Sequence, residues 1–245
     1  MDKSTLAETG PAALLFAVTF LFGGRVYPLR WLVPDQRSII SFGAGMAAAY
    51  VFVHLIPELH GVRLAFAEGA SMDLPYEGMF IYFVALIGFL GFYALDHFRE
   101  RLEEASQDEE SIRAFRLHIG GFAAYAWLMA YLLVHSLEES AVSTAAYAAA
   151  IAFHFLSITH SLRWEHGSLF HDLGRFILAG AVIVGWVVGL ILPIGPAEVA
   201  ILMAFVSGAI IMNSLIMELP SEKDGRFVPF LAGGILYGLL LLPLG

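Results

Sequence analysis

The sequence predicts an all-α integral membrane protein with eight transmembrane helices, and three observations carry this prediction. Apolar residues make up 59% of the 245-residue chain and charged residues only 14%, whereas soluble domains average about 45–50% and about 25%. The apolar residues form long runs, close to the roughly 20 residues that a helix needs to cross a bilayer. Basic residues divide unequally between alternate loops, as in multi-pass proteins. Residues 1–245 are therefore expected to form a single transmembrane domain.

Eight apolar runs account for the predicted spans. They cover residues 11–33, 38–59, 78–98, 117–142, 145–162, 174–192, 197–219 and 227–244. The first is the weakest, since Arg25 and Arg30 follow a short apolar stretch. Two connections, residues 143–144 and 193–196, are so short that the helices they join should pack as antiparallel neighbours. Residues 99–116 alternate acidic and basic side chains, which is typical of a solvated cytoplasmic helix or a mobile segment.

Lysine and arginine predict the orientation. One set of alternate loops holds eleven of these residues, and the other holds only Lys3 and Arg63. Because lysine and arginine concentrate in cytoplasmic loops, both termini are predicted to be non-cytoplasmic. The cell membrane is the expected location, and the lipid bilayer is the first expected partner.

Span two and span seven share a weak repeat. Phe42 and Gly45 recur as Phe205 and Gly208, and a proline recurs at the same offset of 163 residues. The two spans run in opposite directions in the predicted topology, so the chain could contain an inverted repeat, as many transporters do. Glycine pairs four residues apart in spans six and eight favour close helix packing. The glycine face at residues 233, 234 and 238 could also pack on a second copy in a homodimer.

Composition excludes several kinds of site. The chain has no cysteine, so it contains neither disulfides nor thiolate metal ligands. Its net charge of −9 argues against a nucleic-acid partner, since binding phosphates needs a basic face. Histidine and carboxylate are the remaining strong ligands for a divalent metal such as zinc.

Span four carries the densest polar cluster within a predicted span. His135 and Glu139 are four residues apart and would share one helix face, with Ser136 and Glu138 beside them. An imidazole and a carboxylate on one face can bind zinc, and ionisable groups are costly inside a bilayer. The alternative is that the carboxylates simply reach the headgroup region at the outer end of the span.

Two other spans contain histidines. His54 and Glu58 repeat the same spacing at the end of span two, where Pro57 should end the helix. His154 lies near the middle of span five, and His160 lies near its cytoplasmic end. Each of these histidines could instead form a hydrogen bond to a neighbouring helix. Beyond span five, His166 and His171 lie with Glu165 and Asp172 in a loop, where they could capture metal or simply be solvated.

These motifs resemble the ZIP (Zrt/Irt-like) family of divalent-metal transporters. His54, Pro57 and Glu58 match the His-x-x-Pro-Glu run that often ends the family's second span. His135 and Glu139 stand in its fourth-span motif, with serines at residues 136 and 140. His154 begins its fifth-span motif, and residues 218–222 are similar to its acidic seventh-span end.

The resemblance implies an eight-helix bundle with spans four and five enclosed, and transport of a divalent metal towards the cytoplasm. Zinc is the first expectation, and iron or manganese the next. His135, Glu139 and His154 would form one metal site, flanked by Ser136 and Glu138. His54 and Glu58 would collect metal at the outer mouth, and His160 would take part in release. Because Phe155 and Ile158 replace polar positions of the family, a single metal site is implied rather than a binuclear one.

Two alternatives stay open from the sequence. A membrane-embedded hydrolase could place His135, His154, Ser136 and Glu138 around a catalytic zinc ion with an open water position. A non-transporting relative could bind metal as a sensor, as the missing second-site ligands suggest. We expect a transporter rather than an enzyme.

Overall fold

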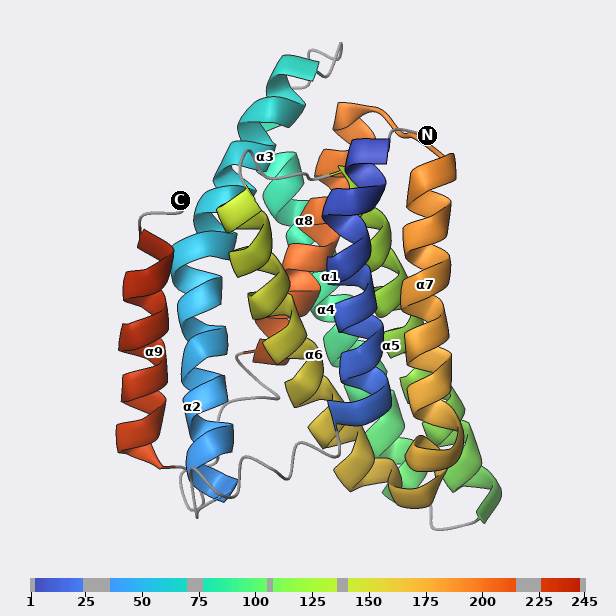
Figure 1. Ribbon diagram of the computed structural model, residues 1–245. Helices are drawn as coiled ribbons and strands as arrows, with labels where there is room; N and C mark the ends of the chain where they lie inside the picture. The colour runs from blue at the N-terminus through green and yellow to red at the C-terminus, as the bar shows by residue number, and fades with distance from the viewer. Residues whose placement is uncertain are drawn as a thin grey trace.

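The computed structural model describes residues 3–23, 36–69, 77–104, 108–135, 141–214 and 226–242, and all the regular structure in these ranges is helical. Successive helical rods alternate in direction, and α1 begins towards the same end of the molecule as α9 finishes (Figure 1). The elements are α1 Lys3–Phe22, α2 Gln36–Ala49, the π-helical η3 Tyr50–Leu55, α3 Ile56–Gly69, α4 Glu77–Glu104, α5 Asp108–His135, α6 Ala141–Leu169, the π-helical η4 Phe170–Gly174, α7 Arg175–Ile191, α8 Pro196–Met212 and α9 Phe227–Leu241.

The apolar helices indicate a multi-pass membrane protein. Among the described residues, five apolar helical stretches are long enough to cross a bilayer, and the last of them, Ile151–Ile191, covers α6 from Ile151 onward together with α7. α8 and α9 are apolar but shorter. Large apolar side chains are exposed along the outside of the bundle, such as Phe83, Ile87 and Leu90 on α4. A surface of this kind is expected where lipid, rather than water, is the solvent.

The second span is longer than predicted. Its helix was expected to end near Pro57, but α2, η3 and α3 form one continuous rod as far as Gly69 (Figure 1). A proline removes one backbone donor and crowds the carbonyl four residues earlier. The π-helical segment Tyr50–Leu55 lies directly before this proline, and such a segment rearranges the local hydrogen bonds without ending the helix.

Other predicted boundaries also move. α1 begins at Lys3, eight residues before the predicted start at Pro11, and Pro11 lies inside it. The predicted connection at Ser143 and Thr144 is wrong, because both residues belong to α6. α5 ends at His135 in the part of the chain that the structure describes, which resumes at Ala141. Small polar residues are tolerated in a helix that packs against others, so they were a poor marker of its start.

The acidic and basic segment at residues 99–116 forms the ends of two helices. α4 continues to Glu104 and α5 begins at Asp108. The segment is not solvated throughout, since Arg99 and Phe115 are buried. Burial of Arg99 becomes important for the site below.

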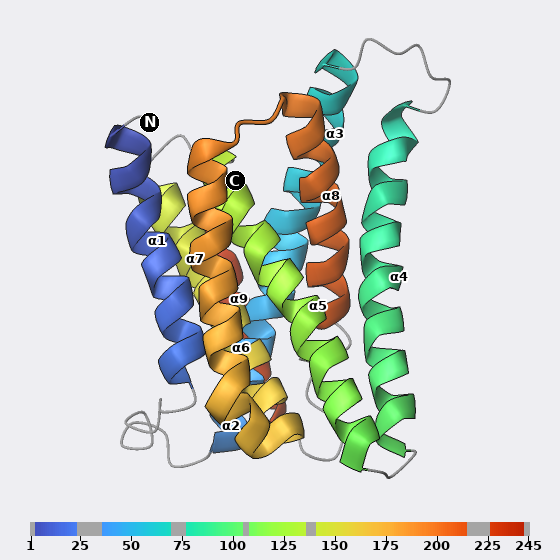
Figure 2. The same cartoon turned by 90° about the vertical axis from the view of Figure 1, so that its right-hand side faces the viewer.

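α7 and α8 do not pack as the neighbours that their short connection predicted. α7 packs mainly against α5 and α1, whereas α8 packs mainly against α4 and α3. α5 lies between them in Figure 2. The Tyr131 hydroxyl of α5 donates a hydrogen bond of 3.0 Å to the carbonyl oxygen of Leu192, where the connection begins. The connection therefore crosses the end of α5 instead of closing a hairpin.

Glycines bring two helix pairs into backbone contact. A Cβ atom added at Gly45 of α2 would lie 2.0 Å from the Phe230 oxygen of α9, and one added at Gly233 of α9 would lie 2.1 Å from the Phe42 oxygen. α9 thus covers α2 within one chain. The glycine face that was expected to support a homodimer is used inside the molecule, so it offers no argument for one.

A second pair repeats this arrangement. A Cβ atom added at Gly208 of α8 would lie 1.7 Å from the Ala85 oxygen of α4, and one added at Gly88 would lie 1.9 Å from the Phe205 oxygen. Gly185 of α7 is equally close to the backbone of α5, at 2.1 Å from the Trp127 oxygen. The predicted close packing is confirmed for the glycine pair of span six, since an added Cβ at Gly189 would also lie 2.9 Å from the Tyr131 oxygen of α5.

Candidate metal centre

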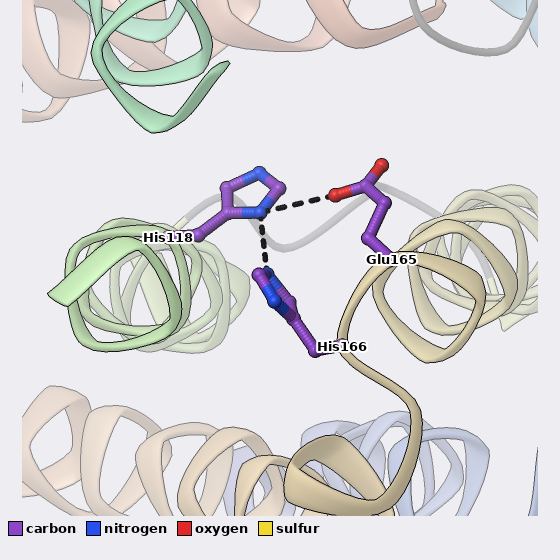
Figure 3. Close-up of side chains that lie close together, drawn as sticks. All are labelled: His118, Glu165 and His166. Atoms are coloured by element: carbon purple, nitrogen blue, oxygen red, sulfur yellow. Dashed lines mark hydrogen bonds and ion pairs between the residues drawn. The ribbon is translucent and has the colours of Figure 1, made fainter. Parts of the chain in front are cut away.

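Three potential metal ligands converge near the ends of α5 and α6. They are His118 of α5 and the adjacent pair Glu165 and His166 of α6 (Figure 3). His118 Nδ1 lies 3.0 Å from His166 Nε2 and 3.2 Å from Glu165 Oε2. In the part of the chain that the structure describes, they are the one group of three or more histidine and acidic residues whose ligand atoms all lie within 4.8 Å of one another.

The spacing of these atoms suits a small divalent cation. Zinc binds histidine nitrogen and carboxylate oxygen at about 2.0–2.1 Å, so two ligands of a tetrahedral ion are about 3.3 Å apart. The two separations from His118 Nδ1, 3.0 Å and 3.2 Å, are close to this ligand–ligand distance. His118 Nδ1 carries at most one hydrogen, so it can donate at most one well-aligned hydrogen bond to His166 or Glu165. A cation would satisfy all three lone pairs.

A tight turn places Glu165 and His166 together. The next residue, Gly167, has φ 52° and is the positive-φ glycine among the described residues. This backbone conformation costs little for glycine and is unfavourable for other residues. The turn follows the two ligands directly and ends the first part of α6.

Aromatic rings enclose the two imidazoles. Phe115 packs edge-on against His166 with ring centroids 5.4 Å apart, and Phe122 packs against His118 at 5.0 Å. His118 is 1% exposed, and Glu165 and His166 are partly buried. The expectation of a solvated loop at Glu165 and His166 is therefore wrong. Because Glu165 and His166 are partly exposed, an ion from water could still reach the cluster.

The two carboxylate oxygens of Glu165 differ in their contacts. The Ser161 hydroxyl donates a hydrogen bond of 2.8 Å to Oε1, one turn back along α6. Oε2 faces His118 and also lies 3.8 Å from Nε of Arg99. This oxygen is buried and accepts no well-aligned hydrogen bond from the described residues. Its approach to His118, at 3.2 Å, is a close contact that becomes an ion pair only when the imidazole is protonated. An under-satisfied buried carboxylate oxygen is a strong acceptor for a cation.

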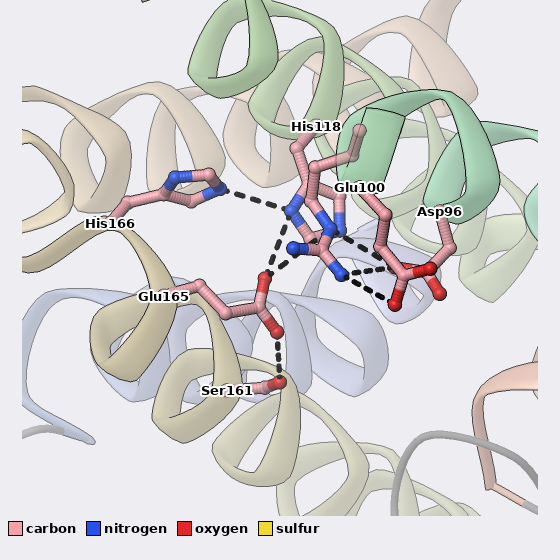
Figure 4. A network of polar contacts seen from close by, with 7 residues as sticks. Asp96, Glu100, His118, Ser161, Glu165 and His166 are labelled. Carbon is pink, nitrogen blue, oxygen red and sulfur yellow. Dashed lines mark hydrogen bonds and ion pairs between the residues drawn. The ribbon is translucent and has the colours of Figure 1, made fainter. Parts of the chain in front are cut away.

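α4 contributes charge to the same place. Arg99 donates to Asp96 Oδ1 through Nε and through its terminal nitrogen, at 3.0 Å and 2.8 Å. Glu100 Oε1 lies 3.6 Å from the guanidinium group. Figure 4 shows Asp96 and Glu100 on one side of this network and Glu165 on the other.

The predicted outer-mouth pair is close together. His54 Nε2 lies 3.7 Å from Glu58 Oε2, in η3 and the first turn of α3. The shared face expected from their spacing is therefore confirmed. Their role with metal stays a prediction.

The histidines of span five differ in environment. His154 is buried, and its Nε2 forms a hydrogen bond of 2.8 Å with the Tyr125 hydroxyl of α5. It lines a cavity of about 10 Å³ together with Ser214 and Tyr237, which is about the size of one water molecule. His160 is exposed on α6.

His135 lies at another level of α5. Its ring contacts Tyr131, with centroids 4.8 Å apart, at the last residue of the helix. Tyr125, the partner of His154, lies ten residues earlier, which is about 15 Å along the axis. Ser136, Glu138 and Glu139 lie outside the described residues, so the site expected from His135, Glu139 and His154 stays a prediction.

His118 is the ligand that sequence reasoning missed. It follows the charged segment directly, at the beginning of an apolar run, and was not singled out. The spacing of polar residues could have indicated it. Tyr125 lies seven residues after His118, on the same face of α5. On α6, the polar residues His154, Ser161 and Glu165 likewise share one face. These two faces form a polar seam between α5 and α6, defined by Tyr125, His118, His154, Ser161 and Glu165.

Comparison with known proteins identifies no relative. No family model, no curated protein and no solved structure matches this chain.

Proposed function

We propose that this membrane protein binds a divalent cation, with zinc as the first candidate, and transports it towards the end of the bundle that carries His118, Glu165 and His166. The observation that carries the proposal is the convergence of these three ligand atoms within 4.8 Å. Two imidazoles and one carboxylate form a ligand set that suits zinc. Iron and manganese are alternatives, since availability as well as affinity decides which metal a site binds.

The polar seam supports transport rather than binding alone. His154 and Tyr125 lie within the apolar bundle, and His118 lies two turns from Tyr125 on α5, about 10 Å along the axis. Buried polar residues are expensive in a membrane and usually mark an ion pathway. A pathway would pass the pair at His154 and end at the cluster, where partial exposure of Glu165 and His166 would allow release.

The ZIP resemblance gives this proposal its topology. The protein would have eight spans, non-cytoplasmic termini and an inverted repeat, in the cell membrane. The repeat has structural support in the two glycine crossings. Gly45 contacts α9 as Gly208 contacts α4, and these two residues are the pair that the sequence relates at an offset of 163. Movement of one half of the bundle against the other would expose the pathway to each side in turn.

The test is metal binding and transport by the purified full-length chain. We expect zinc to bind in isothermal titration, and radioactive zinc to enter proteoliposomes in a saturable manner. The variant His118→Ala/His166→Ala should lose both. His171→Ala is the matched control, because His171 is exposed close to the same turn and forms its 2.8 Å contact with Asp172 instead. Unchanged zinc binding in a folded double variant would refute the site.

A second double variant separates the two places where metal could bind. His135→Ala/Glu139→Ala removes the ligands that the ZIP resemblance implies. Loss of uptake with retained binding at the cluster would place both sites on one pathway. If the wild-type protein binds zinc but does not transport it into proteoliposomes, the result would favour the alternative of a non-transporting metal sensor.

A zinc-dependent hydrolase is a second candidate, favoured by the number of ligands. Three protein ligands would leave one position open for water, as in catalytic zinc sites. Zinc-dependent cleavage of a lipid ester or amide by protein that moves no metal would support this function over transport.

A further inference from the structure

Arg99 is a buried positive charge beside the cluster proposed to bind a cation. Its residue exposure is 7%, and its Nε lies 3.8 Å from Glu165 Oε2. The same oxygen lies 3.2 Å from His118 Nδ1. A metal ion bound by Glu165 and His118 would therefore face the same carboxylate oxygen as the guanidinium group of Arg99.

Asp96 holds Arg99 away from this oxygen. Both hydrogen bonds from Arg99 to Asp96 Oδ1, at 3.0 Å and 2.8 Å, are shorter than the contact with Glu165. Asp96 precedes Arg99 by one helical turn, so the pair forms within α4 and does not depend on the position of α6. The guanidinium group is thus anchored to α4 and only approaches Glu165.

The charged side chains described so far around the cluster carry a net negative charge. Asp96, Glu100 and Glu165 contribute three negative charges and Arg99 contributes one positive charge, with both imidazoles neutral. The sum of these charges, −2, is equal in magnitude and opposite in sign to the charge of one divalent cation. Without the ion, Arg99 is the cation that partly compensates Glu165.

We propose that Arg99 competes with a divalent metal ion for Glu165, and that Asp96 is the positioning residue that limits this competition. The inference rests on the proposed metal site and adds its regulation. In the metal-free protein, Arg99 contacts Glu165 and links α4 to α6. Metal binding replaces this contact, and return of Arg99 promotes release. α4 also packs on α8 and α3, which carry none of the three ligands, so Arg99 couples the site to these helices.

The experiment measures zinc affinity by isothermal titration of the full-length chain. Arg99→Gln should tighten binding by about tenfold, because a like charge near the ion is removed. Asp96→Asn should weaken binding by about tenfold, because the released guanidinium group then pairs with Glu165. The double variant Asp96→Asn/Arg99→Gln should bind like Arg99→Gln, since Asp96 acts through Arg99. Arg101→Gln, an exposed change on the same helix, is the matched control.

The outcomes separate this inference from the proposed function. Zinc binding that is equal in wild type, Arg99→Gln and Asp96→Asn overturns the competition and leaves the site intact. Weaker binding in Arg99→Gln also overturns it, because a merely structural role would lower the affinity. Absence of zinc binding in folded wild-type protein overturns the site and the inference together. If Asp96→Asn does not fold, the direction of the Arg99→Gln change decides alone.

Discussion

α5 and α6 bring polar side chains together at two places, and the two differ in what they can bind. Near the helix ends, His118, Glu165 and His166 direct three ligand atoms at one point. Deeper in the bundle, His154 meets Tyr125 through a single hydrogen bond of 2.8 Å. Both places contain buried histidine, but only the first joins several strong ligands. Burial of a histidine is therefore weaker evidence for a metal site than the convergence of several ligand atoms on one point.

The cause of the difference is backbone geometry. Within a straight helix, residues on one face are three or four positions apart, so each turn directs about one side chain at a given point on a neighbour. At the end of the first part of α6, the consecutive residues Glu165 and His166 both approach His118, and the turn at Gly167 follows them directly. The deeper place has no such turn, and one histidine from α6 meets one tyrosine from α5.

The largest effect should follow removal of the two imidazoles. Zinc affinity of His118→Ala/His166→Ala should fall by more than about 100-fold, because only one strong ligand remains. Removal of the deeper histidine, in His154→Phe, should leave affinity at the cluster within about twofold, since distant sites act independently. Titration calorimetry on both variants checks this. Equal losses would show that the two places form one site.

The deeper contact should matter more for stability. Tyr125→Phe removes the partner of His154 Nε2 and should lower the free energy of unfolding by about 1–3 kcal/mol. Tyr93→Phe, at an exposed position of α4, should change it by less than about 0.5 kcal/mol. Thermal unfolding in detergent compares the two. A Tyr125→Phe protein of unchanged stability with lost zinc binding would reverse the assignment of roles.

The turn itself can be tested at Gly167. Gly167→Ala forces a side chain into a positive φ and should lower the free energy of unfolding by about 1–2 kcal/mol. Zinc affinity should fall several-fold as Glu165 and His166 shift. Gly180→Ala is the control, because no atom lies within 4 Å of its added Cβ and alanine is the better helix former. Similar behaviour of both variants would remove the turn from the explanation.

The smallest effect is expected at Ser161. Ser161→Ala removes the hydrogen bond of 2.8 Å to Glu165 Oε1, so the carboxylate is held less firmly. We expect zinc affinity to fall by about threefold to tenfold, the equivalent of one ordinary hydrogen bond. Ser168→Ala, at an exposed position beyond the turn, should have no effect. A Ser161→Ala affinity equal to wild type would show that His118 alone orients Glu165.

Local patterns predicted much of the helical structure. Apolar runs indicated where α7 and α9 begin, because the lipid requires continuous apolar stretches. The spacing of His54 and Glu58 indicated their contact, since residues four apart share a helix face. Glycines marked close helix crossings. In each case the information lies within a few residues of the chain.

Helix ends and helix neighbours were harder to predict. Pro57 was expected to end a helix that continues, and Ser143 was expected in a loop but lies in α6. The π-helical segment before Pro57 and packing against other helices override these local preferences. A short connection likewise failed to make α7 and α8 neighbours, because α5 passes between them (Figure 2).

The sequence by itself determined an all-helical, apolar chain and the kinds of ligand available for a metal. Both follow from composition and from short-range periodicity. Only the tertiary structure decided that His118 meets His166, 48 residues away, and that Arg99 of α4 faces the same carboxylate. These contacts depend on where each helix turns and on which helices cross. Packing of the whole bundle, rather than any one segment, determines both.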